Sequence, residues 1–109
     1  MSEIADILQK LIQFRDERDW EQFHNSKDLA LAISIEAGEL LELFLWKGNE
    51  EVSKDKLKEE LADVLSYCFL LAEKHQLSIS EIITEKINKN NLKYPTEKAK
   101  GNAKKYTEL

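Results

Sequence analysis

Apolar residues recur at helical spacing along several stretches of the chain, and shorter polar stretches separate them. The first stretch predicts a helix from about Glu3 to Arg18, because its apolar side chains fall near every third or fourth position. An aromatic-rich connector over residues 19–25 follows, and Ser26 is expected to be the N-cap of a second helix. That helix carries residues 29–47 and should end at Gly48, since glycine is the usual residue just past a helix C-terminus.

The second half of the chain predicts two further helices and a tail. A third helix is expected to begin after Ser53 and to continue to about His75. Ser78, with a glutamate three residues later, is typical of a capping box and should open the fourth helix. The fourth helix should end before Pro95, because the residue preceding a proline resists the helical conformation. Residues 95–109 have little apolar content and are expected to form an extended basic tail.

The two central helices are apolar over far more than one stripe. A helix that is apolar nearly all round must be buried nearly all round, and four helices in one short chain cannot easily bury two such elements. The sequence therefore predicts an all-α four-helix bundle that is completed by homo-oligomerisation, as a dimer or a tetramer of the same chain. In the second helix the apolar positions are Leu29, Ala30, Leu31, Ala32, Ile33, Ile35, Leu40, Leu41, Leu43, Phe44 and Leu45.

Composition and charge narrow the class of protein. At 109 residues, with three glycines and one proline, the chain is expected to be a single helical domain over residues 1–109. One cysteine, no basic-then-apolar leader and no long apolar run predict a cytoplasmic protein that is not inserted in a membrane. Residues 1–85 carry 19 acidic and 9 basic side chains, whereas residues 86–109 carry 2 acidic and 7 basic ones. This division argues against a nucleic-acid coat, which needs one broad basic face.

Acidic residues interrupt the apolar helices at positions that a simple core would not tolerate. Glu36 and Glu39 are three residues apart in the second helix, and Glu60 and Asp63 are three apart in the third. That spacing places each pair on one helical face, so four carboxylates can converge if the helices pack together. Gly38 would allow the helices to approach closely.

Two interpretations of these acids remain open from the residues alone. Four carboxylates in a poorly hydrated bundle need a divalent cation, and all-oxygen ligands favour Mg²⁺ or Mn²⁺ over zinc. Alternatively, the acids are exposed and pair with lysines on a helical module that has no catalytic activity. A di-iron centre is disfavoured, because it uses Glu-x-x-His on two helices, and in this chain only Glu21 and His24, in the connector, have that spacing.

At this point the sequence resembles the all-α nucleoside triphosphate pyrophosphohydrolases related to MazG, and in particular their dCTP pyrophosphatase branch. The resemblance covers nearly the whole chain, in order and without large gaps. The E-x-x-E and E-x-x-D pairs are typical of the superfamily, and the W-x-Q-F-H, F-x-W-K and K-Y-T-E-L segments are typical of the branch. The matching residues are Phe14, Glu17–His24, Glu36–Leu40, Glu42–Phe44, Trp46, Lys47, Glu59–Leu61, Asp63–Leu65, Tyr67, Lys86, Asn90, Lys93–Pro95 and Lys105–Leu109.

The resemblance implies a MazG-like bundle and an Mg²⁺-dependent enzyme that cuts dCTP, or a related pyrimidine nucleotide, to the monophosphate and pyrophosphate. Its implied role is to cleanse the nucleotide pool, and Mn²⁺ could replace Mg²⁺. The metal ligands would be Glu36, Glu39, Glu60 and Asp63, with Glu36 or Glu39 helping to deprotonate the attacking water.

The resemblance also implies binding residues for each part of the nucleotide. Trp20 and Trp46 would stack on the base. The phosphates and sugar would be bound by Tyr67, Lys86, Asn90, Lys93 and Tyr94, and the basic tail would fold over the site.

Departures from the branch leave the preferred base open. Relatives often carry His where this chain has Leu11, and Pro where it has Ser26. If the histidine reads the edge of the base, its loss would relax the selectivity for cytosine. The alternatives are therefore a MazG-like enzyme with broad or dUTP preference, or a non-catalytic helical oligomerisation module.

Overall fold

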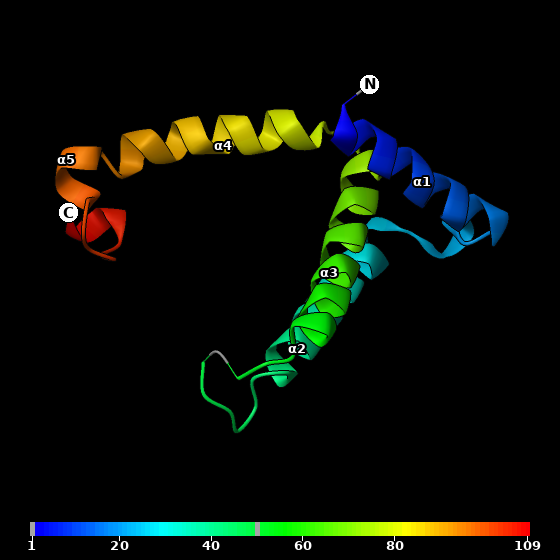
Figure 1. Cartoon of the computed structure of the whole chain (residues 1–109). Helices are drawn as coiled ribbons and strands as arrows, with labels where there is room; N and C mark the ends of the chain where they lie inside the picture. The colour runs from blue at the N-terminus through cyan, green and yellow to red at the C-terminus, as the bar shows by residue number, and fades with distance from the viewer. Residues whose placement is uncertain (1, 50) are drawn as a thin grey trace. The chain divides into compact units, whose positions relative to one another are not determined.

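The computed structural model describes residues 2–49 and 51–109, and these residues form helices and connecting segments without any strand. The prediction of an all-α fold is confirmed. The chain divides into two compact units, one ending at Gln76 and the other spanning Leu77–Leu109. The helices of the first unit are α1 (Glu3–Glu17), the 3₁₀ turn η1 (Glu21–Phe23), α2 (Ser26–Glu42) and α3 (Lys54–Lys74). The second unit contains α4 (Ile79–Lys93), α5 (Thr96–Ala99) and the 3₁₀ turn η2 (Tyr106–Glu108), as Figure 1 shows.

The start of α2 differs from the prediction. Asn25, not Ser26, is the N-cap: it has an extended backbone, and its side-chain oxygen accepts a hydrogen bond of 2.9 Å from the Asp28 N–H. Ser26 is the first residue of the helix, and its hydroxyl lies 2.8 Å from Nε2 of His75. An asparagine satisfies an orphan N–H at a helix start as well as a serine does, so the adjacent polar pair left the choice undecided.

The end of α2 also differs from the prediction. The helix ends at Glu42, and the residues that follow bond three positions back, as Phe44 N–H does to the Leu41 carbonyl at 3.0 Å. Trp46 then adopts a left-handed backbone with φ of 62°, two residues before the glycine expected to stop the helix. A tightened last turn followed by a left-handed residue satisfies the terminal carbonyls, so Gly48 is not needed for termination.

The second unit confirms the start and the end expected for α4. The Ser78 hydroxyl accepts the Glu81 N–H at 3.3 Å, and the helix ends at Lys93, two residues before Pro95. The tail is not wholly extended as predicted, because it includes α5 and η2. The rings of Tyr94 and Tyr106 meet edge to face at 6.1 Å, so an aromatic contact folds the tail back on itself.

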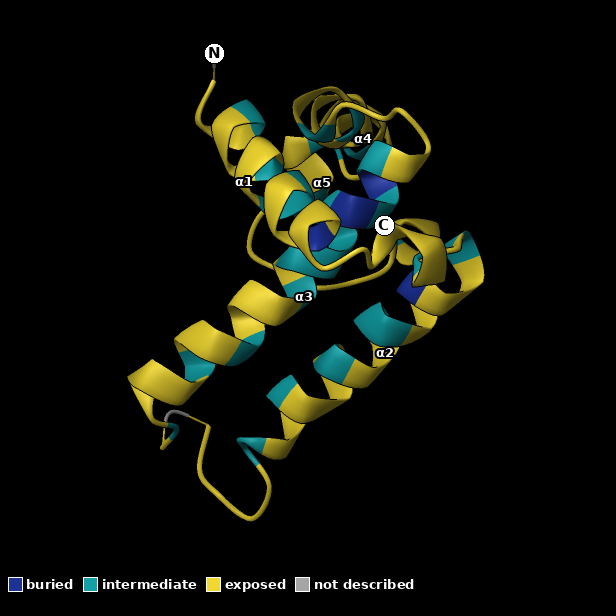
Figure 2. Ribbon diagram, turned by 90° about the vertical axis from the view of Figure 1, so that its right-hand side faces the viewer, coloured by how far each residue is buried: buried dark blue, intermediate teal, exposed yellow. Residues whose placement is uncertain are grey.

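The core of the first unit lies at one end of the α2–α3 hairpin. Helices α2 and α3 pack along each other, and α1 crosses the C-terminal part of α3. The buried residues of the described chain are Arg15, Leu29, Leu70 and Ala72, and Figure 2 shows them gathered where α1, α3 and the start of α2 meet. None of the described helices is long and apolar enough to cross a membrane.

Much of the apolar surface of α2 remains uncovered by its own chain. Leu31, Ile35 and Leu41 are 49%, 62% and 71% exposed. The expectation that a helix this apolar is buried nearly all round is therefore not met within one chain. The predicted homo-oligomer stays a prediction, and the exposed side chains identify the face that a second copy would cover.

Candidate active site

The packing of α2 against α3 brings the predicted acidic residues together. Glu36, Glu60 and Asp63 each offer a carboxylate oxygen, and these three oxygens lie within 4.8 Å of one another. Glu39, one turn after Glu36 on α2, is exposed and close enough to act electrostatically on both Glu36 and Glu60. The two acid pairs therefore face each other across the helix interface, as the three-residue spacing predicted. We call these four residues the acid cluster.

Two members of the acid cluster, Glu36 and Glu60, have raised pKa values. The pKa of Glu36 is raised to about 7, first by a hydrogen bond that its protonated carboxyl makes with Glu39, then by burial and by the neighbouring negative charges. The pKa of Glu60 is also raised, first by burial and then by the charges of Glu39 and Asp63. Burial and the charges of neighbouring carboxylates contribute to both shifts, and a bound cation would offset the repulsion.

The oxygens of the acid cluster fit a hard divalent cation. Oε2 of Glu36 and Oε2 of Glu60 are buried and find no hydrogen-bond partner within the described residues. Buried carboxylate oxygens are normally paired, and a metal ion held by Glu36 and Glu60 would supply the missing partner. The ligand set contains only oxygen atoms, and such a set suits Mg²⁺, Mn²⁺ or Ca²⁺ better than it suits zinc.

Gly38 does not act as the sequence suggested. A Cβ placed on it would meet no atom within 4 Å, so the residue faces open space and does not permit a close approach of α3. Helices α2 and α3 therefore pack through other positions, and the role of Gly38 within one chain is not explained by the structure.

A pocket of about 410 Å³ adjoins the acid cluster, because Asp63 forms part of its wall. Its volume lies in the usual range for small-molecule sites. Trp20 and Phe14 meet edge to face in this wall, with ring centres 5.7 Å apart. Tyr67 lines it from α3, one turn after Asp63, and Leu11 lines it from α1. We call it the aromatic pocket; its full lining is Ile7, Lys10, Leu11, Phe14, Arg15, Trp20, His24, Asp63, Ser66, Tyr67 and Leu70.

The structure separates the two tryptophans that were predicted to bind the base. Trp20 lies in the wall of the aromatic pocket. Trp46 lies beyond the end of α2, is 94% exposed and is not among the residues that line the pocket. A base-binding role for Trp46 is therefore not supported within one chain, whereas the position of Trp20 fits its predicted role.

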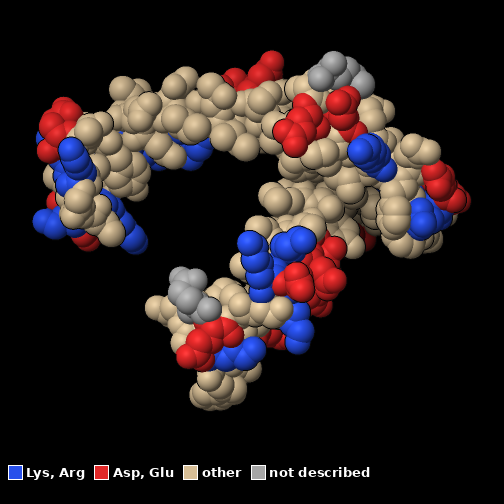
Figure 3. Space-filling view, viewed as in Figure 1, with Lys and Arg blue, Asp and Glu red and all other residues tan. Residues whose placement is uncertain are grey.

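The remaining predicted binding residues belong to the second unit. Lys86 is exposed on α4, and Asn90 follows one turn later in a half-buried position. Lys93 has its ammonium 4.9 Å from the centre of the Tyr106 ring, and Tyr94 contacts the same ring. Figure 3 shows Lys and Arg side chains along this unit. Their role in binding phosphate and sugar stays a prediction.

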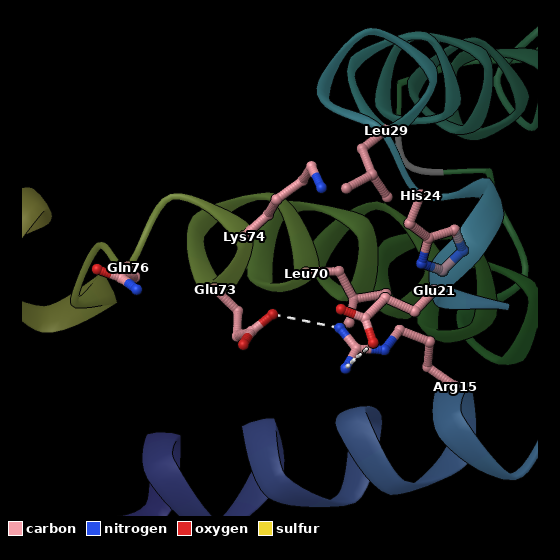
Figure 4. Close-up of a pocket in the computed structure, with 8 residues that line it drawn as sticks. All are labelled: Arg15, Glu21, His24, Leu29, Leu70, Glu73, Lys74 and Gln76. Carbon is pink, nitrogen blue, oxygen red and sulfur yellow. Dashed lines mark hydrogen bonds and ion pairs between the residues drawn. The ribbon is translucent and has the colours of Figure 1, made fainter. Parts of the chain in front are cut away.

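The sequence interpretation missed a second, smaller pocket of about 170 Å³ built around a buried arginine. Arg15 is 7% exposed, and its guanidinium lies 3.2 Å from the Glu73 carboxylate and 3.6 Å from the Glu21 carboxylate, as Figure 4 shows. A signal was present in the sequence, because Arg15 follows Leu8, Leu11 and Ile12 at helical spacing on the apolar stripe of α1. An arginine on such a stripe must find carboxylate partners when it is buried.

The raised pKa of Glu36 predicts a pH dependence of stability in the metal-free protein. Between the ordinary value of 4.5 and about 7, the folded state keeps a proton on Glu36 that the unfolded chain has lost. The free energy of unfolding should therefore fall as pH rises through this window and level off above it. Glu36→Gln stays neutral and lacks this loss, so the variant should gain stability relative to the wild type from pH 5 to pH 7.5.

Urea unfolding of both proteins in EDTA, at matched concentrations, measures this difference. Because every other titrating group is shared, the comparison isolates Glu36. A difference in unfolding free energy that stays constant or shrinks as pH rises would contradict the assignment of the raised pKa.

Comparison with known proteins identifies the family. Residues 31–109 match the MazG-like family. The dCTP pyrophosphatase 1 of Bos taurus is 39% identical over 114 residues, which cover 97% of this chain and 68% of that protein. The protein of the same name from Homo sapiens is also 39% identical, with 97% and 67% covered. A pyrophosphatase from Archaeoglobus fulgidus has a solved structure that superposes with a TM-score of 0.81 at 37% identity, covering 87% of this chain and 94% of that one. From this evidence, together with the acid cluster on α2 and α3, the chain belongs to the MazG-like family.

Proposed function

We propose that this chain is a nucleoside triphosphate pyrophosphohydrolase that converts dCTP, or a related pyrimidine deoxynucleotide, to the monophosphate and pyrophosphate. The observation that carries the proposal is the acid cluster beside an aromatic pocket, in a chain whose relatives are named dCTP pyrophosphatase. The proposed role is to remove unwanted nucleotides from the cytoplasmic pool.

The acid cluster supplies the metal ligands in this proposal. Glu36, Glu39, Glu60 and Asp63 would hold Mg²⁺, and the two buried oxygens without partners support this assignment. Mn²⁺ would serve as a substitute, since it accepts the same oxygen ligands. The bound metal would neutralise charge on the triphosphate and acidify a water molecule.

The proposed reaction is a single displacement at the α-phosphorus, with a carboxylate as the base. Glu36 or Glu39 accepts the proton of the attacking water, because their carboxylates belong to the acid cluster that would hold the metal and its water. The water oxygen forms a bond to the α-phosphorus as the bond to the bridging oxygen breaks, and pyrophosphate leaves with that oxygen. No covalent enzyme intermediate is needed, so alignment and charge neutralisation account for the catalysis.

The aromatic pocket holds the base in this proposal. Trp20 and Phe14 offer ring surfaces for stacking, and Tyr67 lines the same pocket one turn after Asp63 on α3. Lys86, Asn90, Lys93 and Tyr94 of the second unit are assigned to the phosphates and sugar, supported by their resemblance to the family pattern and by the positive charge of residues 86–109.

The residue at position 11 favours an alternative in which the enzyme accepts more than one base. Leu11 lines the aromatic pocket at the position where relatives often carry histidine, so the side chain at this position offers no hydrogen bond to the edge of the base. Stacking alone accepts every base. A broader preference, including dUTP, is therefore the second candidate.

A homo-oligomer, dimer or tetramer, forms part of the proposal. The exposed apolar side chains of α2 and the 94% exposed Trp46 support it, because such surfaces mark protein–protein contacts. A second copy packed on this face would cover Trp46 and could bring it to a base pocket, as its assigned role requires.

Turnover of a nucleotide panel tests the proposed reaction. With Mg²⁺, chromatography should show monophosphate and pyrophosphate as products, fastest from dCTP-type substrates and including 5-methyl-dCTP. Glu39→Gln should lower kcat by at least about a hundredfold, since it removes one ligand of the acid cluster. Glu42→Gln, an exposed change on the same helix outside the cluster and the pocket, is the matched control and should leave turnover near the wild-type value.

Each outcome of that assay separates the alternatives. A different best substrate would retain the enzyme class and favour the broader preference. Nucleoside diphosphate and phosphate as products would contradict the proposed site of cleavage. No turnover of any nucleotide with Mg²⁺ or Mn²⁺ would favour the non-catalytic oligomerisation module.

Light scattering during gel filtration tests the oligomer. The mass should be at least twice the 12.7 kDa of one chain, because the exposed apolar face needs a partner. Leu41→Glu places a charge at a side chain that is 71% exposed, and it should lower the mass without unfolding the chain. A mass of one chain at every concentration would contradict the proposal.

A further inference from the structure

Arg15 connects three separate segments of the first unit. Its Nε donates to Asp16 of α1 at 2.9 Å, its Nη1 donates to Glu73 of α3 at 3.2 Å, and its Nη2 lies 3.6 Å from Glu21 of η1. It is the only charged side chain buried in the part of the chain that the structure describes. We call Arg15, Asp16, Glu21 and Glu73 the arginine cluster.

The arginine cluster shares a wall with the aromatic pocket. Arg15, His24 and Leu70 line both that pocket and the smaller pocket of about 170 Å³. Figure 4 shows the side chains of Arg15, Glu21 and His24 beside one another on the side of the smaller pocket. A shift of the arginine cluster would therefore move part of the wall that the proposed base contacts.

The same arginine holds the loop that carries Trp20. The backbone carbonyl of Arg15 accepts the N–H of Trp20 at 3.1 Å, while its side chain pairs with Glu21, the next residue. Asp19, immediately before Trp20, has a left-handed backbone with φ of 53°, which a residue other than glycine adopts at some cost. Surrounding contacts must hold such a turn in place, and Arg15 supplies two of them, to the Trp20 N–H and to the Glu21 carboxylate.

His24 directly follows the η1 turn, and its imidazole is influenced by the charge of Arg15. Its Nδ1 is buried without a hydrogen-bond partner in the described residues. Burial lowers the pKa of His24, and the charge of Arg15 lowers it further. The pocket wall therefore presents a neutral imidazole, whose position is fixed by the η1 turn and not by a hydrogen bond from Nδ1.

We propose that Arg15 is a positioning residue for the aromatic pocket: through Glu21 and Glu73 it fixes the turn that places Trp20 and His24 against the substrate base. Arg15 sets the affinity for the nucleotide and leaves the rate of the chemical step nearly unchanged, because the acid cluster is not among its partners. The inference rests on the proposed function for the identity of the ligand.

A merely structural ion pair is the alternative. Buried ion pairs often add little net stability, because removing the charges from water offsets their attraction. An ion pair that only stabilised the fold would change the melting temperature and leave KM as it is. The test must therefore separate stability from nucleotide affinity.

Glu73→Gln is the informative variant. Glu73 is 34% exposed in its side chain, and Arg15 keeps Asp16 and Glu21 as partners, so the fold should survive the loss of one carboxylate. We expect KM for dCTP to rise roughly threefold to tenfold with kcat within about twofold of the wild type. Glu73→Asp restores a carboxylate and should recover most of the affinity. Glu3→Gln, an exposed change on α1 with no ion pair among the described residues, is the control and should change neither constant.

Quenching of Trp20 fluorescence supplies a readout that does not need turnover. In a Trp46→Phe background Trp20 is the sole tryptophan, and acrylamide should quench it more strongly in Glu73→Gln than in Glu73→Asp or the parent. If the wild type hydrolyses no nucleotide, the proposed function fails and quenching alone still decides the positioning of Trp20. Quenching equal to the parent, or an unchanged KM in an active Glu73→Gln enzyme, would overturn the proposal.

Discussion

Repulsion among carboxylates held between two packed helices is the constraint on which this structure depends. Glu36, Glu60 and Asp63 meet within 4.8 Å across the α2–α3 interface, and two of their oxygens are buried without partners in the described residues. A chain selected only for stability would replace such acids by apolar residues. Their presence is explained if a cation compensates the negative charge. The raised pKa of Glu36 shows that its ionised form is unfavourable beside the other carboxylates.

The aromatic pocket is connected to the acid cluster through a shared residue. Asp63 belongs to both the acid cluster and the pocket wall, so a ligand in the pocket necessarily lies beside the carboxylates. Trp20 reaches the same wall only because the η1 turn folds back from α1, and the arginine cluster ties that turn to α3. Two groups of charges therefore adjoin one pocket: the acid cluster through Asp63, and the arginine cluster through Arg15.

The sequence predicted the helices and the acid pairs because both depend on local spacing. Apolar periodicity located α1, α3 and α4, and the i,i+3 spacing of Glu36 with Glu39 and of Glu60 with Asp63 placed each pair on one face. The errors concerned the two ends of α2, where more than one residue can begin or end a helix. Asn25 and Ser26 can both cap α2, and a left-handed Trp46 ends the C-terminal turn before the glycine is reached.

Features that depend on tertiary packing were harder to predict. Besides its neighbour Asp16, Arg15 pairs with Glu21 of η1 and with Glu73, 58 residues away on α3, so no local pattern predicts these two pairs. Trp46 looked equivalent to Trp20 in sequence, yet the structure leaves it 94% exposed. Several apolar side chains of α2 are also uncovered, because periodicity alone indicates burial without indicating what supplies it.

The most direct test of the central claim is the anomalous difference map of a crystal grown or soaked with Mn²⁺. The account predicts a peak bounded by the carboxylates of Glu36, Glu60 and Asp63, within about 2.0–2.4 Å of their oxygens. No peak at this position under saturating Mn²⁺, or a peak held by other residues, would contradict the interpretation of the acid cluster as a metal site.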